Sequence, residues 1–337
     1  MSEYTYRKSM DKFQRLLVPT VYDDVPTFLG VPLASDRKGL AGANAAILGV
    51  PTQSPQMPVG REIGVSILDT MRLRKASLKY GSYLPELDID VFEHIRLVDN
   101  GDVPTPYPMT SKEMTKHFAL VEGRIAEILQ VGCVPLIIGA HPYVVAKAIG
   151  EQAGGKVGIL HLDAHGDNME EHEGTRWSLA SWVARVSELK SVNMKNFVQI
   201  GMRGPRNFKE QVEWHRRKGS TIYTYADIKR KGMPAVGREA IHRARSNASN
   251  LLLNIDFDVL DLGAAPGLDE PLGITTADLL MLANEVGKSK VTALNVEWLP
   301  TPAWEPYHPP AWPLYWILTW TILYLLAGMA KPKRQSP

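Results

Sequence analysis

At positions 161–167 the chain reads His161-Leu162-Asp163-Ala164-His165-Gly166-Asp167, which sets Asp163, His165 and Asp167 at every second position. The apolar run 157–160 precedes this stretch and favours a strand. In an extended strand alternate side chains point to the same face, so the three side chains can converge on one point. A polar strand end with chance spacing is the simpler explanation, but buried charges need partners or a metal. Carboxylates beside an imidazole suit a divalent first-row cation, and we therefore expect a metal site here.

Two further strand ends carry side chains of the same kind. Asp256 and Asp258 follow the apolar run 251–255, and His141 comes just after the apolar run 135–138. Taken singly, Asp258 could cap a turn, Asp256 could be solvated and His141 could cap a helix. Together with the first cluster, the strand ends supply four carboxylates and two imidazoles, more than one zinc site needs. This number suits two divalent cations that share carboxylates.

Strand-like runs alternate with helical ones along most of the chain. We expect strands at 45–50, 95–98, 135–138, 157–160, 197–200, 221–223, 251–255 and 291–296, a loop entering a helix at 60–75, and helices at 110–130, 142–152, 177–189, 208–218, 236–245 and 275–286. Continuous apolar strands of this kind predict an α/β fold with a mostly parallel sheet, whose ligands gather at the carboxyl ends of the strands. No repeat or linker divides the sequence. We expect one domain over 1–337, with a divergent N-terminal extension (1–44) and an apolar C-terminal helix (about 314–330).

The composition argues against several classes of function. The chain has 337 residues, 45% of them hydrophobic, and a net charge of +2, which gives no reason to expect a polyanionic partner. No repeat of aromatic and basic residues suggests nucleic-acid binding. The single Cys133 cannot form an intrachain disulfide, and the N-terminus has mixed charge without the apolar run of a signal peptide. We expect a cytoplasmic protein.

The C-terminal segment is the candidate for membrane contact. No Asp, Glu, Lys or Arg occurs between Pro306 and Ala330, as in a membrane span. Prolines, the last of them Pro313, delay the helix until about Leu314 and leave a length at the short limit for a span. We therefore favour a helix packed in the core or against another subunit, with a membrane-associated tail as the alternative.

Two further residues, Glu297 and His172, suit the chemistry of such a centre. Two adjacent cations would lower the pKa of a water that bridges them, which makes hydroxide available at neutral pH. Hydroxide of that kind attacks an electrophilic carbon, and a leaving amine then needs a proton. Glu297 follows the expected strand 291–296 and could hold a cationic substrate. His172 could carry the proton, although its acidic neighbours would equally suit an exposed loop histidine.

These motifs together resemble those of the ureohydrolases, the family of arginase, agmatinase, formiminoglutamase and guanidino-acid hydrolases. The family's Asp-Ala-His-x-Asp motif matches 163–167, its Asp-x-Asp motif matches 256–258, and its Gly-Gly-Asp-His motif appears as Ile-Gly-Ala-His at 138–141. Agmatinase-like patterns also occur at 49–51, 58–64, 98–102 and 199–203. The resemblance spans about residues 45–300.

The resemblance implies a three-layer α/β/α sandwich that assembles as a trimer or hexamer of ureohydrolase-like subunits, identical or different. It also implies two divalent metal ions in each active site, usually manganese and in some members nickel. By position, one ion would be held by His141, Asp163, Asp167 and Asp256, and the other by His165, Asp163, Asp256 and Asp258. Glu297 matches the glutamate that faces the guanidinium group, and Asn168 opens the loop that reads the substrate's distal end.

Several departures from the family pattern bear on the substrate. Ala140 replaces an acidic residue, the loop after Asp167 is much shorter than in arginase or agmatinase, and residues 268–273 replace the loop Thr-Gly-Thr-Pro-Glu-Pro-Gly-Gly. Arginine and agmatine are therefore doubtful substrates. Trp298 and Trp304 beside the acidic anchor would suit a compact cation with methyl groups, or would merely pack beneath the C-terminal helix.

The favoured function is a dinuclear-metal hydrolase that cleaves a C–N bond of a guanidine-type substrate by attack of a metal-bridging hydroxide. The expected partner is a small cationic guanidine, preferably a compact N-alkylated guanidine or a biguanide such as metformin, which would yield guanylurea and dimethylamine. A conventional agmatinase or guanidino-acid hydrolase that releases urea is the alternative. Further alternatives are a supporting subunit of a hetero-oligomeric hydrolase and a membrane-tethered protein.

Overall fold

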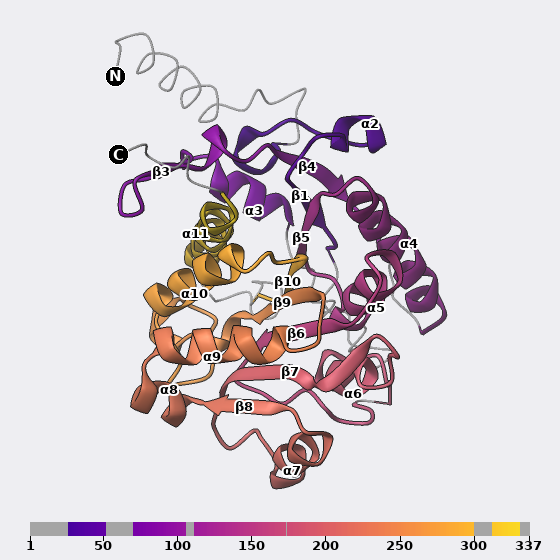
Figure 1. Cartoon of the computed structure of the whole chain (residues 1–337), viewed down its shortest axis with the longest axis vertical. Helices are drawn as coiled ribbons and strands as arrows, with labels where there is room; N and C mark the ends of the chain where they lie inside the picture. The colour runs from indigo at the N-terminus through magenta and orange to yellow at the C-terminus, as the bar shows by residue number, and fades with distance from the viewer. Residues whose placement is uncertain (1–25, 52–69, 106–110, 173, 300–311, 331–337) are drawn as a thin grey trace.

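An eight-stranded sheet runs through the centre of the protein (Figure 1). The computed structural model describes residues 26–51, 70–105, 111–172, 174–299 and 312–330. Each pair of neighbouring strands in this sheet is parallel. In spatial order the strands are β4 (Leu97–Asp102), β1 (Ala45–Gly49), β5 (Val134–Ile138), β10 (Ala293–Trp298), β9 (Asn250–Asp256), β6 (Val157–Leu162), β7 (Val192–Met202) and β8 (Thr221–Thr224).

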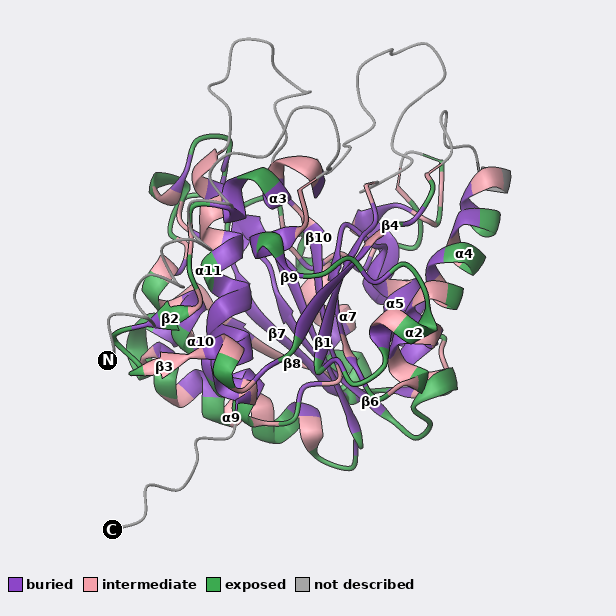
Figure 2. Ribbon diagram, turned by 90° about the horizontal axis from the view of Figure 1, so that it is seen from above, coloured by how far each residue is buried: buried purple, intermediate pink, exposed green. Residues whose placement is uncertain are grey.

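Helices cover both faces of this sheet, and Figure 2 shows the buried strands between them. One face is covered by α3 (Thr70–Ser77), α8 (Tyr225–Lys231), α9 (Met233–Arg245), α10 (Thr276–Lys288) and α11 (Trp312–Met329). The other face is covered by α2 (Arg37–Leu40), α4 (Ser111–Gln130), α5 (Pro142–Gln152) and α6 (Trp182–Val186), while α7 (Lys209–Lys218) lies by the edge strand β8. The predicted three-layer α/β/α sandwich with a parallel sheet is confirmed.

Burial on both faces explains why the strands read as continuous apolar runs. Strands β1, β6 and β9 are buried along their whole length. Two apolar layers result, one on each side of the sheet. Short elements complete the fold: η1 (Phe28–Gly30), the antiparallel pair β2 (Tyr83–Leu84) and β3 (Ile89–Asp90), η2 (Val91–Glu93), η3 (Leu179–Ser181), η4 (Phe257–Val259) and η5 (Leu262–Ala264).

The described part of the expected N-terminal extension is packed against the sheet. The backbone N–H of Phe28 donates to Asp99 Oδ2 at 2.8 Å, and Phe28 itself is fully buried. Asp99 also forms an ion pair with Arg74, whose Nε lies 2.8 Å from Asp99 Oδ2 and whose Nη1 lies 2.7 Å from Asp102 Oδ1. The two carboxylates at the end of β4 therefore have a structural role, because they anchor α3 and the N-terminal segment to the edge of the sheet.

The C-terminal helix α11 packs in the core, as we favoured. It is apolar and long enough to be a candidate membrane span by length and composition, but most of it is buried inside the protein. It begins at Trp312 and not near Leu314, because Pro313 falls in the first helical turn, where a missing N–H removes no helical hydrogen bond. Where α11 crosses α10, the backbones of the two helices approach closely, and Asn284 Nδ2 donates to the carbonyl of Tyr324 at 3.0 Å.

One expected helix is shorter in the structure, and another has bounds that the sequence did not assign. The helix expected at 177–189 is only η3 followed by α6, because Ser178 caps a short turn and accepts the N–H of Ala180. The basic cluster 229–231, which we expected on a solvated helix face without assigning bounds to that helix, lies in α8, which has a capping box between Thr224 and Asp227. The helix expected within 60–75 is seen from Thr70 onward, and the preceding residues of that range lie outside the described part.

The crossing of α10 and α11 gives a test of this packing. A Cβ on Gly328 would lie 2.1 Å from the carbonyl oxygen of Asn284, so we expect Gly328→Ala to destabilise the protein by about 1–3 kcal/mol. The control is Gly123→Ala in α4, where an added Cβ meets nothing within 4 Å and should raise stability by roughly 0.5–1 kcal/mol. Denaturant unfolding measures both changes, and equal midpoints for the two variants would contradict the packing.

Candidate metal centre

The acidic residues meet at the carboxyl ends of three neighbouring strands. Strands β10, β9 and β6 are adjacent and parallel, so their carboxyl ends lie at the same edge of the sheet. Glu297 lies near the end of β10, Asp256 ends β9, and Asp163 directly follows β6. All three side chains are buried. The sheet therefore brings these carboxylates together, as the sequence predicted.

A first group of ligand atoms comes from His161, Asp163, Asp167 and Glu297. One nitrogen or oxygen of each of these side chains lies within 4.8 Å of the others. The strand ends at Leu162, and the convergence arises because the chain then bends, with Asp167 in the left-handed region at a φ of 46°. We expected the alternation of side chains along a strand to bring residues 163–167 together. In the structure this alternation instead places His161 and Asp163 on the same face. His161 was not expected here, although its spacing from Asp163 could have indicated it.

A second group comprises Asp163, His165 and Asp258. Nδ1 of His165 lies 2.8 Å from Asp258 Oδ2, and its Nε2 lies 3.0 Å from Glu270 Oε1. Glu270 is buried and also contacts Arg206 at 2.9 Å. It belongs to the divergent loop 268–273, where sequence reasoning identified a changed loop but no individual residue. If His165 binds a metal through Nδ1, Glu270 is placed to orient the ring from behind.

Asp256 and His141 lie outside these two groups. Asp256 is buried and accepts the backbone N–H of Asp258 at 2.8 Å. His141 stands just before α5 with neither ring nitrogen in a well-formed hydrogen bond, and Phe118 packs on it at 5.1 Å between ring centres. Of the four ligands expected for the first ion, only Asp163 and Asp167 share a group in the structure. The assignment of His141 and Asp256 as ligands stays a prediction.

The remaining predicted site residues have different surroundings. Glu297 is fully buried, its Oε1 accepts from Asn254 at 2.6 Å, and its Oε2 has no hydrogen-bonding partner. Asn168 uses its Nδ2 to hold the carbonyl of Gln211 at the start of α7. His172 is half-buried, and two backbone hydrogen bonds of 2.9 and 3.1 Å join it to Thr175.

Neither tryptophan has a defined role at the site. Trp298 is half-buried and packs against the apolar layer below α10 and α11, and Trp304 lies outside the described residues. The proposed roles of His172, Asn168 and Trp298 in catalysis or substrate binding therefore stay predictions.

Burial controls the charges of the carboxylates. Burial, followed by the charge of Asp258, raises the pKa of Asp163 to about 7. Burial and neighbouring carboxylates likewise raise the pKa values of Asp167, Asp256 and Glu297 above their ordinary range. Without a cation, the cluster is therefore expected to retain protons near neutral pH.

His165 and Asp258 form the charged pair in this cluster. Burial disfavours the protonated ring, but contacts with Asp163 and Asp258 outweigh it and raise the pKa of His165 to about 12. Burial opposes ionisation of Asp258 in the same way, yet the hydrogen bond with His165 lowers the pKa of Asp258 to about 2. The proton on His165 thus supplies the positive charge that a bound cation would otherwise supply to these carboxylates.

The unsatisfied polar atoms of the cluster fit a bound cation. Asp163 Oδ2 and Glu297 Oε2 are both buried and have no hydrogen-bonding partner. Buried polar atoms of native proteins normally have partners, so two orphaned carboxylate oxygens in one acidic cluster point to a ligand that completes them. Carboxylate and imidazole donors suit a divalent first-row cation.

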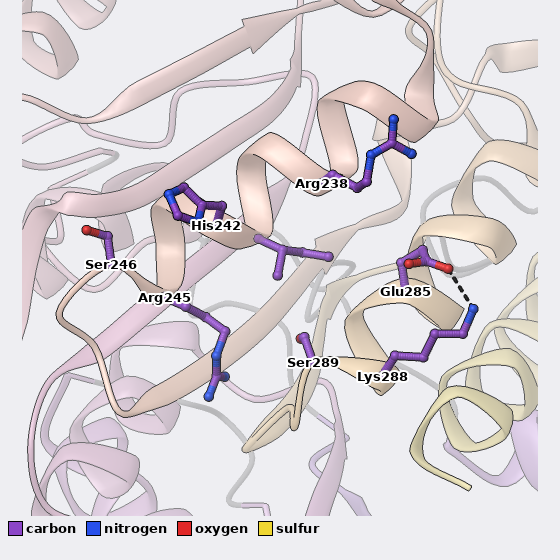
Figure 3. A pocket seen from close by; sticks show the side chains of 8 residues that line it. Arg238, His242, Arg245, Ser246, Glu285, Lys288 and Ser289 are labelled. Carbon is purple, nitrogen blue, oxygen red and sulfur yellow. Dashed lines mark hydrogen bonds and ion pairs between the residues drawn. The ribbon is translucent and has the colours of Figure 1, made fainter. Parts of the chain in front are cut away.

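A pocket at the opposite edge of the sheet is too basic to bind a cationic substrate. It lies between the ends of α9 and α10, and Figure 3 shows its lining of Arg238, Ile241, His242, Arg245, Ser246, Glu285, Lys288 and Ser289. Helix α9 ends just before β9 begins, so the pocket is near the amino edge of the strands. Its basic lining would repel a cationic substrate.

Glu270 offers a test of the second group. Glu270→Gln removes the carboxylate behind His165 and should weaken Mn²⁺ binding by about 10–100-fold, because such partners orient a ligating imidazole. Asp269→Asn is the matched control, since Asp269 contacts the same Arg206 at 3.1 Å but is 59% exposed. Calorimetric titration of the metal-free protein measures both. Equal Mn²⁺ affinities in the two variants would show that Glu270 does not support metal binding by His165.

The pKa shifts predict that metal binding displaces protons. A cation competes with the proton on His165 and, near neutral pH, with the proton on Asp163, whose pKa values are raised to about 12 and about 7. Mn²⁺ affinity should therefore rise from about pH 6 to about pH 8, with net proton release. Calorimetry in two buffers of different ionisation enthalpy counts the released protons. An affinity that does not change with pH would contradict this account.

Comparisons with known proteins agree with this geometry. The model of the arginase family matches residues 43–302. Agmatinase from Bacillus anthracis is 26% identical over 233 residues, which cover 67% of this chain and 73% of that protein. Formimidoylglutamase from Bacillus subtilis has a similar structure, with a TM-score of 0.78, 20% identity and coverage of 96% of this chain and 98% of that one. A structure of Trypanosoma cruzi formiminoglutamase with Mn²⁺ gives a TM-score of 0.75 at 20% identity, covering 92% and 100%. The chain belongs to the arginase family of hydrolases, which act on C–N bonds of guanidino-type substrates.

Proposed function

We propose that the chain hydrolyses a C–N bond of a compact N-alkylated guanidine or biguanide, with two divalent cations in its site. When bound, the cations would supply hydroxide at neutral pH by lowering the pKa of a water. Water adds to the central guanidine carbon, and the C–N bond to the amine breaks as the amine takes up a proton. For N,N-dimethylbiguanide (metformin) the products would be guanylurea and dimethylamine.

The buried carboxylate of Glu297 is the observation that carries this proposal. Its Oε1 is held by Asn254, whereas its Oε2 has no partner although the residue is fully buried. A planar guanidinium group offers N–H donors and a positive charge, which satisfy such an oxygen. Glu297 therefore orients the substrate's cationic head beside the carboxylates that would hold the metal.

The surrounding arginines favour a substrate without a distal carboxylate. Arg185 pairs with Glu170 and Glu188, and Arg206 pairs with Asp269 and Glu270. Arg203 donates to backbone carbonyls, among them those of residues 258, 260 and 270. Arg185 on α6 and the two arginines between β7 and α7 are thus already engaged, so they offer little to a guanidino acid. A compact cation fits this surface better.

The identity of the metal belongs to the proposal as well. Nickel and manganese both accept carboxylate and imidazole ligands, so the donor set suits either ion. The similar formiminoglutamase structure that contains Mn²⁺ supports manganese. Nickel follows only from the resemblance to family members that act on small guanidines.

The main alternative is an agmatinase or guanidino-acid hydrolase that releases urea. The curated relatives with these names, among them the agmatinase from Bacillus anthracis, support this reading equally well. A supporting subunit of a hetero-oligomeric hydrolase is a further alternative. A trimeric or hexameric assembly and a cytoplasmic location are further parts of the proposal, and they follow from the resemblance and the composition.

An amine-release screen tests the substrate. The purified protein, loaded with Ni²⁺ or Mn²⁺, is incubated with N,N-dimethylbiguanide, methylguanidine, agmatine and 4-guanidinobutyrate, and dimethylamine and urea are measured. We expect dimethylamine from the biguanide, and Glu297→Gln should lose turnover by about 100-fold or more while keeping its metal. Urea from agmatine or 4-guanidinobutyrate alone would establish the alternative. Normal turnover in Glu297→Gln would remove the residue's anchoring role.

A further inference from the structure

A row of buried polar side chains crosses four neighbouring strands directly below the site. It consists of Asn295 on β10, Asn254 on β9, His161 on β6 and Gln199 on β7, and none of the four is exposed. The strand register aligns Asn295 with Asn254, Asn254 with His161, and His161 with Gln199. Glu297 and Asp256 stand two residues further along β10 and β9, and Asp163 follows two residues after His161, just past the end of β6. The row is therefore one side-chain layer beneath the carboxylates.

The direction of the hydrogen bonds in this row is fixed at one end. Asn295 Nδ2 lies 3.0 Å from the carbonyl oxygen of Ala140, which can only accept. The same Nδ2 donates to Asn254 Oδ1 at 2.7 Å. Asn254 must then turn its Nδ2 toward the other side, where Glu297 Oε1 lies at 2.6 Å and His161 Nδ1 at 3.2 Å.

This order decides the tautomer of His161. An amide Nδ2 can only donate, so His161 Nδ1 accepts and the ring proton sits on Nε2. That nitrogen lies 2.9 Å from Asp163 Oδ2, in a contact that is not aligned as a hydrogen bond, so its N–H acts on the carboxylate through its partial positive charge. A protonated nitrogen has no lone pair for a cation, so His161 is not available as a ligand through Nε2, although it lies within the first group of ligand atoms.

Gln199 extends the same arrangement to the bend that follows β6. Its Nε2 donates to the carbonyl of His165 at 2.7 Å and to that of Asp163 at 3.2 Å. These bonds hold the backbone of the bend, which places the ring of His165 against Asp258. Each member of the row thus contacts a residue of the site or the backbone that carries one.

We propose that this row positions the site: Asn254 holds Glu297 through Oε1, and His161 turns its Nε2–H toward Asp163 and is not a metal ligand. The free Oε2 of Glu297 is then directed at the substrate. This first part rests on the proposed function, because it takes Glu297 as the residue that binds the guanidinium group. The second part concerns the protein alone.

The tautomer of His161 tests the second part without any reaction. In metal-free protein labelled with ¹⁵N-histidine, two-bond ¹⁵N–¹H correlations should show the Nε2–H form for the resonance that disappears in His161→Gln. In Asn254→Asp a carboxylate faces Nδ1, and the proton should move to that nitrogen. An Nδ1–H form in the unchanged protein would overturn the proposal, and so would an unchanged tautomer in Asn254→Asp.

The number of bound metal ions separates a positioning residue from a ligand. His161→Gln retains a side-chain donor for Asp163, so it should bind as many Mn²⁺ ions per chain as the unchanged protein after dialysis. Elemental analysis measures the ratio. Loss of one Mn²⁺ per chain would show that His161 is a ligand and would overturn the second part.

Binding of methylguanidine to the Mn²⁺-loaded protein tests the role of Asn254. We expect Asn254→Ala to weaken binding by about tenfold or more at unchanged metal content, since a hydrogen bond to a buried charge is lost. In a Glu297→Gln background the same substitution should add little. The control is Asn250→Ala on the same strand, because Asn250 donates to the carbonyl of Gly154 at the far end of β9.

The outcomes distinguish the row from the proposed function. Unchanged methylguanidine binding in Asn254→Ala would overturn the positioning of Glu297 while leaving the proposed function intact. Failure of the unchanged protein to bind methylguanidine would argue against the proposed function. The role of His161 in the row would then be tested by its tautomer and by the number of bound Mn²⁺ ions, which do not depend on any substrate.

Discussion

Buried negative charge at the ends of three adjacent strands is the constraint on which the site depends. Asp163, Asp256 and Glu297 are all buried, and ionised carboxylates in such surroundings are costly unless a cation or a hydrogen-bond donor compensates them. The protein supplies part of this compensation through the ring of His165 and the amide of Asn254. The carboxylate charge that remains uncompensated shows where metal and substrate would bind. The carboxylate oxygens without a hydrogen-bonding partner are therefore the best guide to the site.

The strand ends could be predicted from sequence because parallel sheets gather polar residues there. The alternation of apolar strands with helices placed Asp163, Asp256 and Glu297 at one edge, and the structure agrees. Glu270 could not be found in this way, because it reaches His165 from a loop more than a hundred residues away in sequence. Local patterns carry no information about such a contact. The bend after Leu162 could not be predicted for a related reason, because a hydrogen bond from the distant Gln199 side chain holds it.

The apolar C-terminal segment shows the same limit at the level of the fold. Its composition suits a membrane span and a core helix equally, and only its neighbours separate the two. The glycines at the crossing of α10 and α11, Gly287 and Gly328, permit a backbone approach that a pattern of apolar residues does not reveal. The length of α6 was likewise decided outside its own sequence, by the irregular chain around Ser178.

The position of α11 also has a consequence for synthesis of the chain. This last helix packs against α3, and Lys79, just beyond α3, places its ammonium group 3.4 Å from the ring centre of Trp316. One face of the sheet is thus completed by two segments that lie far apart in the sequence. While the ribosome still holds residues 312–329, the part of that face that α11 covers stays open, and its apolar side chains are exposed to other nascent chains.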